Sequence, residues 1–203
     1  SWSIKYSLSS VKDVLFHPTD TNIIYGSGSS FIRSSDGGES FIKNSQLVGN
    51  ISRLEIAVTN SAPNYVYVVG ANNSSSFRAV WRSTDSGVNF DTRATTPNLL
   101  GYETDGSDNS GQGWFDLAIA VSPTNPNEVY VGGVNIWKST DGGQTWQINA
   151  HWYYVEQPNY VHADIHYLGF FGNRLYCGSD GGVFYSDNKG NNWIDISEGL
   201  GIT

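Results

Sequence analysis

The chain is poor in sulfur and in positive charge. Cys177 is the only cysteine among 203 residues, so no disulfide can form within the chain. Eleven Lys and Arg stand against 19 Asp and Glu, which gives a formal net charge of −8. The basic residues are dispersed, whereas nucleic acids and anionic membrane surfaces attract clusters of Lys and Arg. The composition therefore predicts neither nucleic acid nor an anionic membrane as a partner.

Long apolar runs and methionine are absent as well. No run approaches the ~20 apolar residues that span a bilayer, so we expect no membrane insertion. A complete gene product begins with Met, whereas this sequence begins with Ser1 and contains none, so we expect a processed or excised piece. Cys177 lies in a strand-like run, where we expect a small buried side chain.

Aromatic residues and glycine are abundant instead. The chain has 7 Trp, 12 Tyr, 9 Phe and 23 Gly. Aromatic side chains are enriched in half-buried strands, and glycine supplies the backbone conformations that turns demand. This composition predicts an all-β core without helices.

One eight-residue pattern, Ser-x-Asp-x-Gly-x-x-aromatic, occurs four times; we call these segments the repeat turns. They begin at Ser34, Ser83, Ser139 and Ser186, so successive copies lie 49, 56 and 47 residues apart. A period of roughly 40 to 50 residues built from short strands is typical of a propeller, because one such unit cannot bury its apolar face alone.

The third position of each repeat turn is expected to be structural. It is occupied by Asp36, Asp85, Asp141 and Asn188. A carboxylate or amide oxygen there can accept backbone N–H groups of the turn, while glycine supplies a positive φ. The competing interpretation makes the aspartates metal ligands or catalytic acids. Asn188 favours the structural role, because it still accepts hydrogen bonds but carries no charge.

The repeat turn resembles the Asp-box, or BNR repeat, of sialidases, family 74 glycoside hydrolases and sortilin-type receptors. The resemblance implies a β-propeller with these turns between the third and fourth strands of each blade, away from the binding face. Residues 112–118, 132–143, 162–166 and 178–182 also resemble secreted bacterial BNR-propeller proteins of the type IX secretion kind. That similarity implies a secreted or cell-surface location.

The repeats divide the chain into four predicted blades, at about residues 9–46, 51–96, 114–150 and 161–197. Residues 1–8 are interpreted as the closing strand of a preceding blade. Propellers typically have four to eight blades, and this strand is one more than a ring of four complete blades would contain. We therefore expect part of a ring of seven or more blades. The rest of the parent chain or another subunit would complete the ring, since an isolated array leaves open edges.

Candidate site residues lie where the first strand of each predicted blade begins, since these strands line the channel of a propeller. The spacing of His162, Asp164 and His166 matches the two-residue period of a strand, which predicts that the three share one face. Such a set can bind a divalent metal such as zinc, bind sugar hydroxyls, or transfer protons. A hydrogen-bonded structural cluster is the remaining alternative. Arg53 lies at the equivalent end of the second blade and is a candidate ligand-binding residue.

Asp116 and Asp164 form the candidate catalytic pair, followed by Asp180. Hydrolysis of a glycoside with inversion needs two carboxyl groups about 6.5 to 9.5 Å apart. The Phe-Arg-Ile-Pro motif of sialidases is absent from the sequence.

Other candidate ligand contacts lie in two loops. Asp105 lies in an acidic insertion where Asp, Ser and Asn alternate as at the start of a calcium loop, although the glycine and glutamate of an EF-hand are missing. Trp114 and Trp152 belong to aromatic clusters that can stack on sugars, but we favour packing between blades for them.

The function favoured by these observations is non-catalytic. We expect an extracellular module that binds a glycan or a protein partner. The alternatives are a glycoside hydrolase that uses Asp116 and Asp164, and a structural component of a secreted assembly.

Overall fold

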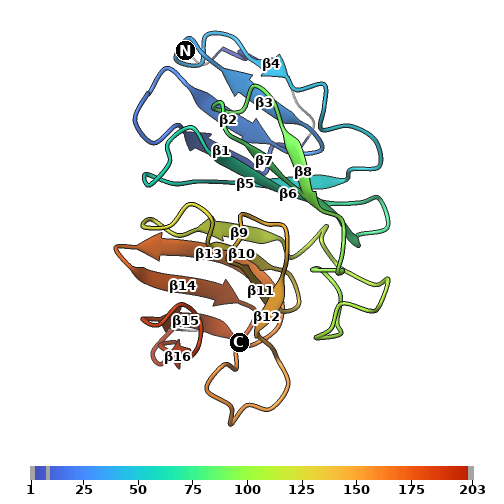
Figure 1. Cartoon of the computed structure of the whole chain (residues 1–203), viewed down its shortest axis with the longest axis vertical. Helices are drawn as coiled ribbons and strands as arrows, with labels where there is room; N and C mark the ends of the chain where they lie inside the picture. Colours follow the sequence, from blue (N-terminus) through green and yellow to red (C-terminus); the bar gives the residue numbers. More distant parts are fainter. Residues whose placement is uncertain (1–2, 8–9, 201–203) are drawn as a thin grey trace.

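The chain forms four antiparallel sheets of four strands in a computed structural model that describes residues 3–7 and 10–200. The sheets follow one another as blades of a β-propeller, with the first and last blades at opposite ends of the array (Figure 1). No helix occurs in the described residues, so none there is long and apolar enough to cross a membrane. The predicted all-β propeller is therefore confirmed.

Each blade is built from four consecutive strands. The first contains β1 (Asp13–Phe16), β2 (Ile24–Ser27), β3 (Phe31–Ser34) and β4 (Ile42–Lys43), and the second contains β5 (Arg53–Val58), β6 (Val66–Ala71), β7 (Phe77–Ser83) and β8 (Asp91–Ala94). The third contains β9 (Ala118–Val121), β10 (Val129–Gly132), β11 (Ile136–Ser139) and β12 (Gln147–Ala150), and the fourth contains β13 (Ile165–Phe171), β14 (Arg174–Ser179), β15 (Gly182–Ser186) and β16 (Ile194–Asp195). Contacts join β1 to β5, β5 to β9 and β9 to β13, so the first strands are inner neighbours.

The predicted closing strand at residues 1–8 is only partly covered by the described residues. Ser1, Trp2 and Leu8, which belong to the predicted closing strand at residues 1–8, lie outside the described residues. Residues 3–7 are described and carry no strand.

The hydrophobic core lies between the blades. One cluster joins the first and second blades through Phe31, Leu54 and Trp81. A second joins the second and third blades, and a third joins the third and fourth. Leu99 and Leu100 add fully buried side chains to the second cluster from the long β8–β9 connection. Burial of apolar area between consecutive blades thus stabilises the array.

The outer face of the first blade is exposed where the other blades are covered. Val14, Ile56, Ile119 and Leu168 occupy the same position on the first strand of each blade, as their strand pairing shows. Ile56, Ile119 and Leu168 are buried against the preceding blade, whereas Val14 is 59% exposed. The first blade therefore presents an apolar face of the kind that is covered elsewhere in the molecule.

The repeat turns join the third and fourth strands of every blade and share one hydrogen-bond pattern. In the third blade, the Ser139 hydroxyl donates to Asp141 at 2.8 Å and accepts from the Gly143 N–H at 2.8 Å. Asp141 also accepts the Thr145 N–H at 3.0 Å. The same three bonds recur around Asp36, Asp85 and Asn188. The third-position oxygen therefore holds the turn closed.

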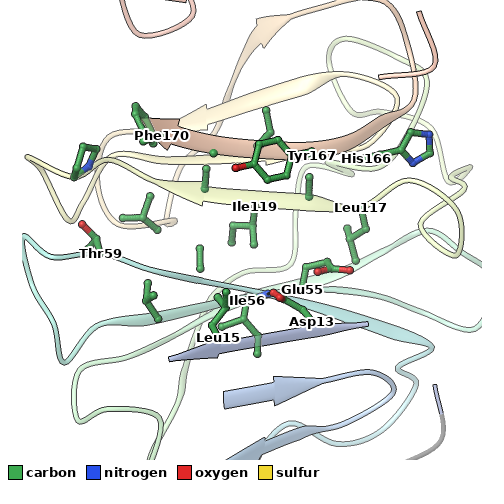
Figure 2. A pocket seen from close by; sticks show the side chains of 18 of the residues that line it. Asp13, Leu15, Glu55, Ile56, Thr59, Leu117, Ile119, His166, Tyr167 and Phe170 are labelled. Carbon is green, nitrogen blue, oxygen red and sulfur yellow. The ribbon is translucent and has the colours of Figure 1, made fainter. Parts of the chain in front are cut away.

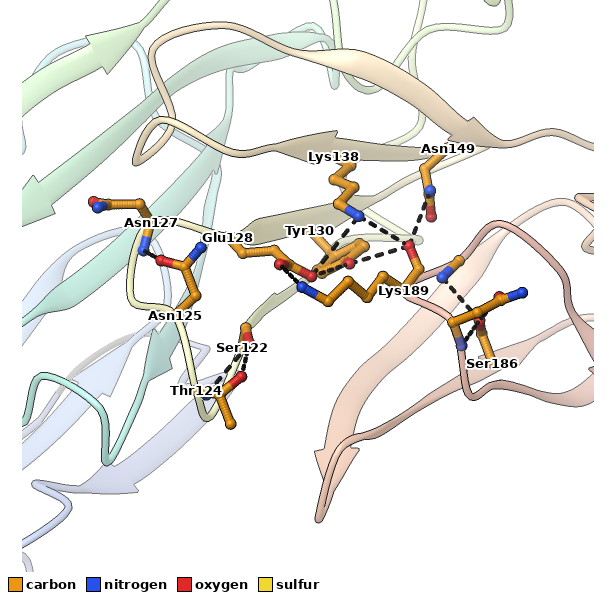
Figure 3. Close-up of polar contacts among 12 residues, drawn as sticks. Ser122, Thr124, Asn125, Asn127, Glu128, Tyr130, Lys138, Asn149, Ser186 and Lys189 are labelled. Carbon is orange, nitrogen blue, oxygen red and sulfur yellow. Dashed lines mark hydrogen bonds and ion pairs between the residues drawn. The ribbon is translucent and has the colours of Figure 1, made fainter.

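Each of the last three repeat turns is also bonded to the blade before it. The carbonyl at its fourth position accepts a side-chain donor of that blade: Ser86 from Arg33, Gly142 from Arg93, and Lys189 from Tyr130, Lys138 and Asn149. Figure 3 shows the last of these junctions, where buried Glu128 also accepts from Lys189 at 2.8 Å. The repeat turns thus connect neighbouring blades as well as strands.

Candidate functional site

The candidate carboxylates lie just outside the inner strands. Asp116 precedes β9, Asp164 precedes β13, and Asp180 lies in the turn between β14 and β15. The sequence placed these candidates where the first strands begin, and the structure places Asp116 two residues before β9 and Asp164 one residue before β13. We call Gln112, Asp116, Asp164, His166 and Asp180 the mouth cluster, because they gather at the start of the inner strands of the third and fourth blades.

The Gln112 side chain brings two of these carboxylates together. Its amide nitrogen donates to Asp116 Oδ2 at 3.4 Å and to Asp164 Oδ1. Asp116 is 1% exposed, and its other oxygen, Oδ1, has no hydrogen-bond partner among the residues that the structure describes. Burial, together with the nearby negative charge of Asp164, raises the pKa of Asp116 to about 7. Asp116 can therefore hold a proton near neutral pH.

Asp164 sits in a strained backbone conformation beside Asp180. Its φ is +67°, a left-handed value that is uncommon outside glycine and that clusters at functional sites. Its carbonyl accepts the Asp180 N–H at 3.2 Å. Burial, followed by the charge of Asp180, raises the pKa of Asp164. Asp180 in turn lies 2.7 Å from His166 Nε2.

The metal-binding prediction for His162, Asp164 and His166 is not supported. Strand β13 starts only at Ile165, so the alternation that would align the three side chains does not extend through them. His162 Nδ1 lies 3.1 Å from the Ala163 carbonyl instead. Within residues 3–7 and 10–200, no three His, Cys, Asp or Glu side chains are grouped to hold a metal ion.

Asp105, where the sequence resembles the start of a calcium loop, is hydrogen-bonded within its own loop. Its carboxylate accepts the Ser107 N–H at 2.9 Å, as in an Asx turn. Asp108 accepts the N–H groups of Tyr102 and Glu103 and the side chain of Asn98. The acidic loop therefore uses its carboxylates to hold its own backbone.

Arg53 braces the mouth cluster from the second blade. Its guanidinium donates to Glu55 at 2.8 Å and to the carbonyls of Trp114, Phe115 and Leu117. These bonds fix the segment that carries Asp116. Protein groups occupy its donors, so the structure gives Arg53 a positioning role, while its ligand-binding role stays a prediction.

Trp114 and Trp152 are exposed, which corrects the expectation that they pack between blades. Trp114 is 63% exposed and lies beside Phe115, whose ring meets His166 edge-on at 4.8 Å between centroids. Trp152 is 39% exposed and stacks on Tyr153 at 4.3 Å. Exposed aromatic rings of this kind can stack on the apolar faces of sugars.

A cavity of about 450 Å³ lies between the inner strands of the four blades. Figure 2 shows Asp13, Glu55 and His166 toward one side of it, with Thr59 and Phe170 toward the other. Burial raises the pKa of both Asp13 and Glu55. The cavity is thus lined mainly by apolar residues with acidic side chains on one side, and it borders the mouth cluster through His166.

Sequence reasoning missed Gln112 and the pairing of His166 with Asp180. Gln112 stands between two glycines, and nothing in that pattern distinguishes it from a solvent-exposed loop residue. The proximity of His166 to Asp180 depends on the β13–β14 pairing with its register shift near Ile165, which spacing alone does not predict.

No protein-family model matches the chain. A curated protein of Neosartorya fischeri, named as a probable oligoxyloglucan-reducing end-specific xyloglucanase, is 26% identical over 207 residues; the match covers 92% of this chain and 23% of the relative. The chain thus spans about a quarter of that relative's length.

Solved structures with a similar fold include two GH74 enzymes. The GH74 xyloglucanase from Xanthomonas campestris superimposes with a TM-score of 0.67 at 19% identity, covering 91% of this chain and 30% of the enzyme. An ancestral GH74 enzyme gives 0.68 at 18% identity, covering 98% and 27%. The chain is therefore similar to the propellers of glycoside hydrolases.

Proposed function

We propose that the chain is part of a glycoside hydrolase and that the mouth cluster supplies carboxyl groups for cleaving a β-linked glucan of the xyloglucan class. The observation that carries the proposal is the buried Asp116, with its pKa raised to about 7, beside Asp164. A carboxylic acid that keeps its proton near neutral pH can protonate a leaving group, while a charged neighbour assists on the other side. The curated relative supports hydrolysis over the non-catalytic binding role that the sequence favoured.

The exposed aromatic rings support a glycan as the ligand. Trp114 and Phe115 lie directly beside the mouth cluster, and Trp152 offers a second exposed surface. Sugar rings stacked on Trp114 would bring a glycosidic bond toward Asp164 and Asp180. A secreted or cell-surface location belongs to the same proposal, because a polysaccharide substrate lies outside the cell. We also propose that the repeat turns are Asp-boxes and that the protein is exported by type IX secretion.

The distance between the two carboxyl groups predicts whether hydrolysis retains or inverts the configuration at the anomeric carbon. A single amide nitrogen contacts both Asp116 and Asp164, so their facing oxygens lie closer than the roughly 6.5 to 9.5 Å of inverting enzymes. If these two act alone, the spacing favours retention at the anomeric carbon. Inversion would assign the second carboxyl group to Asp180 or to another part of the parent protein.

We also propose that the outer faces of the first and fourth blades pack against further repeats, supplied by the parent chain or another subunit. Val14 and Phe16 on the first blade, and Phe171 and Ile194 on the fourth, are exposed apolar side chains. The glycan and these repeats are then the partners of the chain.

The test is hydrolysis of xyloglucan oligosaccharides by the purified chain, by Asp116→Asn and Asp164→Asn, and by Asp91→Asn as the control. Asp91 is exposed at the start of β8, away from the mouth cluster. Loss of a general acid or base lowers the rate by roughly 10²- to 10⁴-fold. We expect this loss in the first two variants only. Glycan binding without cleavage would restore the non-catalytic role.

A further inference from the structure

Gln112 connects carboxylates that belong to different blades. Asp116 precedes β9 of the third blade, and Asp164 precedes β13 of the fourth. The Gln112 amide nitrogen contacts both, and the contact with Asp164 is the shorter of the two. An amide NH₂ group has two hydrogens and no acceptor on nitrogen, so it can donate to two carboxylate oxygens at once.

We propose that Gln112 is a positioning residue that holds Asp164 as the charged member of the carboxyl pair and leaves Asp116 as the member that carries the proton. Hydrogen bonds donated to a carboxylate favour its charged form. The shorter bond therefore directs the negative charge toward Asp164. The use of this arrangement in catalysis rests on the proposed function, whereas the arrangement itself does not.

The surroundings of Asp116 disfavour a charge there. Asp116 is buried, and within residues 3–7 and 10–200 its Oδ1 atom lacks a hydrogen-bond partner. A buried carboxylate with an unsatisfied oxygen loses more hydration than it regains, so the neutral acid costs less free energy. Arg53 is the nearby cation, but its donors are bonded to Glu55 and to backbone carbonyls.

The surroundings of Asp164 are more evenly balanced. Burial, followed by the charge of Asp180, disfavours a charge on Asp164 and raises its pKa, while Gln112, His166 and His162 act in the opposite direction. Asp180 is itself hydrogen-bonded to His166 at 2.7 Å. Gln112 is therefore the neutral donor that opposes the rise in the pKa of Asp164.

The backbone around Gln112 allows its side chain to be removed selectively. The Gln112 carbonyl accepts the N–H groups of Phe115 at 2.7 Å and Asp116 at 3.1 Å. Those bonds do not involve the side chain, so Gln112→Ala keeps them. Gln144 offers a matched control, since its exposed amide donates to the Asp141 carbonyl in a repeat turn.

The experiment is a carbon-13 NMR titration of the carboxyl groups of Asp116 and Asp164 in the wild-type chain, Gln112→Ala, Gln112→Asn and Gln144→Ala. We expect Asp116 to titrate above Asp164 in the wild type. Each Gln112 variant should narrow this gap by about one pH unit, because Asp164 loses the shorter of the two hydrogen bonds that favour a charged carboxylate. Gln144→Ala should leave the gap unchanged.

An unchanged gap in folded Gln112→Ala or Gln112→Asn would overturn the proposal, and so would a wild-type Asp164 that titrates above Asp116. The asparagine variant keeps an amide but is one methylene too short to bridge the pair, which separates lost positioning from lost polarity. The titration needs no substrate, so failure of hydrolysis would leave its outcome intact.

Discussion

Aspartates occupy two contrasting places in this molecule. In the repeat turns they are exposed or half-buried, and hydrogen bonds from the turn hold the pKa of Asp36 and Asp141 at about 2. In the mouth cluster Asp116 is buried beside the half-buried Asp164, and the pKa of Asp116 rises to about 7. The same side chain thus stabilises a turn where donors surround it and keeps its proton near neutral pH where they are scarce. The difference lies in the environment, not in the residue type.

The largest difference between the mouth cluster and the repeat turns is expected in catalytic activity. Asp164→Asn should lose hydrolysis of xyloglucan oligosaccharides by roughly 10²- to 10⁴-fold, because it removes a charged group at the reacting bond. Asp141→Asn should remain active at temperatures where it is folded. Initial rates on the two purified variants check this. Equal losses in both would remove the distinction between the two places.

The second contrast is in stability. Asp141→Ala removes the acceptor for two hydroxyls and two backbone N–H groups, so we expect it to lower the free energy of unfolding by about 2 kcal/mol. Solvent exposure of the carboxylate keeps the loss from being larger. Urea unfolding monitored by tryptophan fluorescence measures it. A mutant as stable as the wild type would show that the repeat turn does not need the carboxylate.

The pH dependence of stability should have opposite signs at the two places. Folded Asp116 has a pKa of about 7, whereas an aspartate in the unfolded chain has its ordinary pKa of 3.8, so the contribution of Asp116 to stability falls as the pH rises between these values. Asp141 has a pKa of about 2 when folded, so its contribution is lost as the pH falls from about 4 to about 2. In calorimetry, the stability of Asp116→Asn should fall less than that of the wild type as the pH rises toward 7. The stability of Asp141→Asn should fall less than that of the wild type as the pH drops toward 2. The opposite dependence of stability on pH would contradict the pKa shifts of Asp116 and Asp141.

The smallest effect is expected at Asn188→Asp. Its amide oxygen already accepts from Ser186 and from the Asn192 N–H, as the aspartates of the other turns do. Adding a charge should change the free energy of unfolding by less than about 1 kcal/mol. Thermal unfolding of this variant beside the wild type checks it; a large gain would mean that the charge, and not the acceptor oxygen, stabilises these turns.

The fold was largely predictable from the sequence because the repeat turns act locally. Ser139, Asp141 and Gly143 make their bonds within five residues, so the pattern and its geometry coincide. The mouth cluster depends on contacts between blades. Asp164 breaks the strand alternation through its positive φ, and Gln112 reaches it across 52 residues of sequence. Spacing therefore located Asp116 and Asp164 but not the groups that set their protonation.

The most direct test is site-resolved carboxyl titration of Asp116 and Asp141 in one wild-type sample. We expect Asp116 to titrate near pH 7 and Asp141 near pH 2, on either side of the ordinary aspartate pKa of 3.8. Two titrations near pH 4 would contradict it, because the mouth cluster and the repeat turns would then hold their aspartates in the same way.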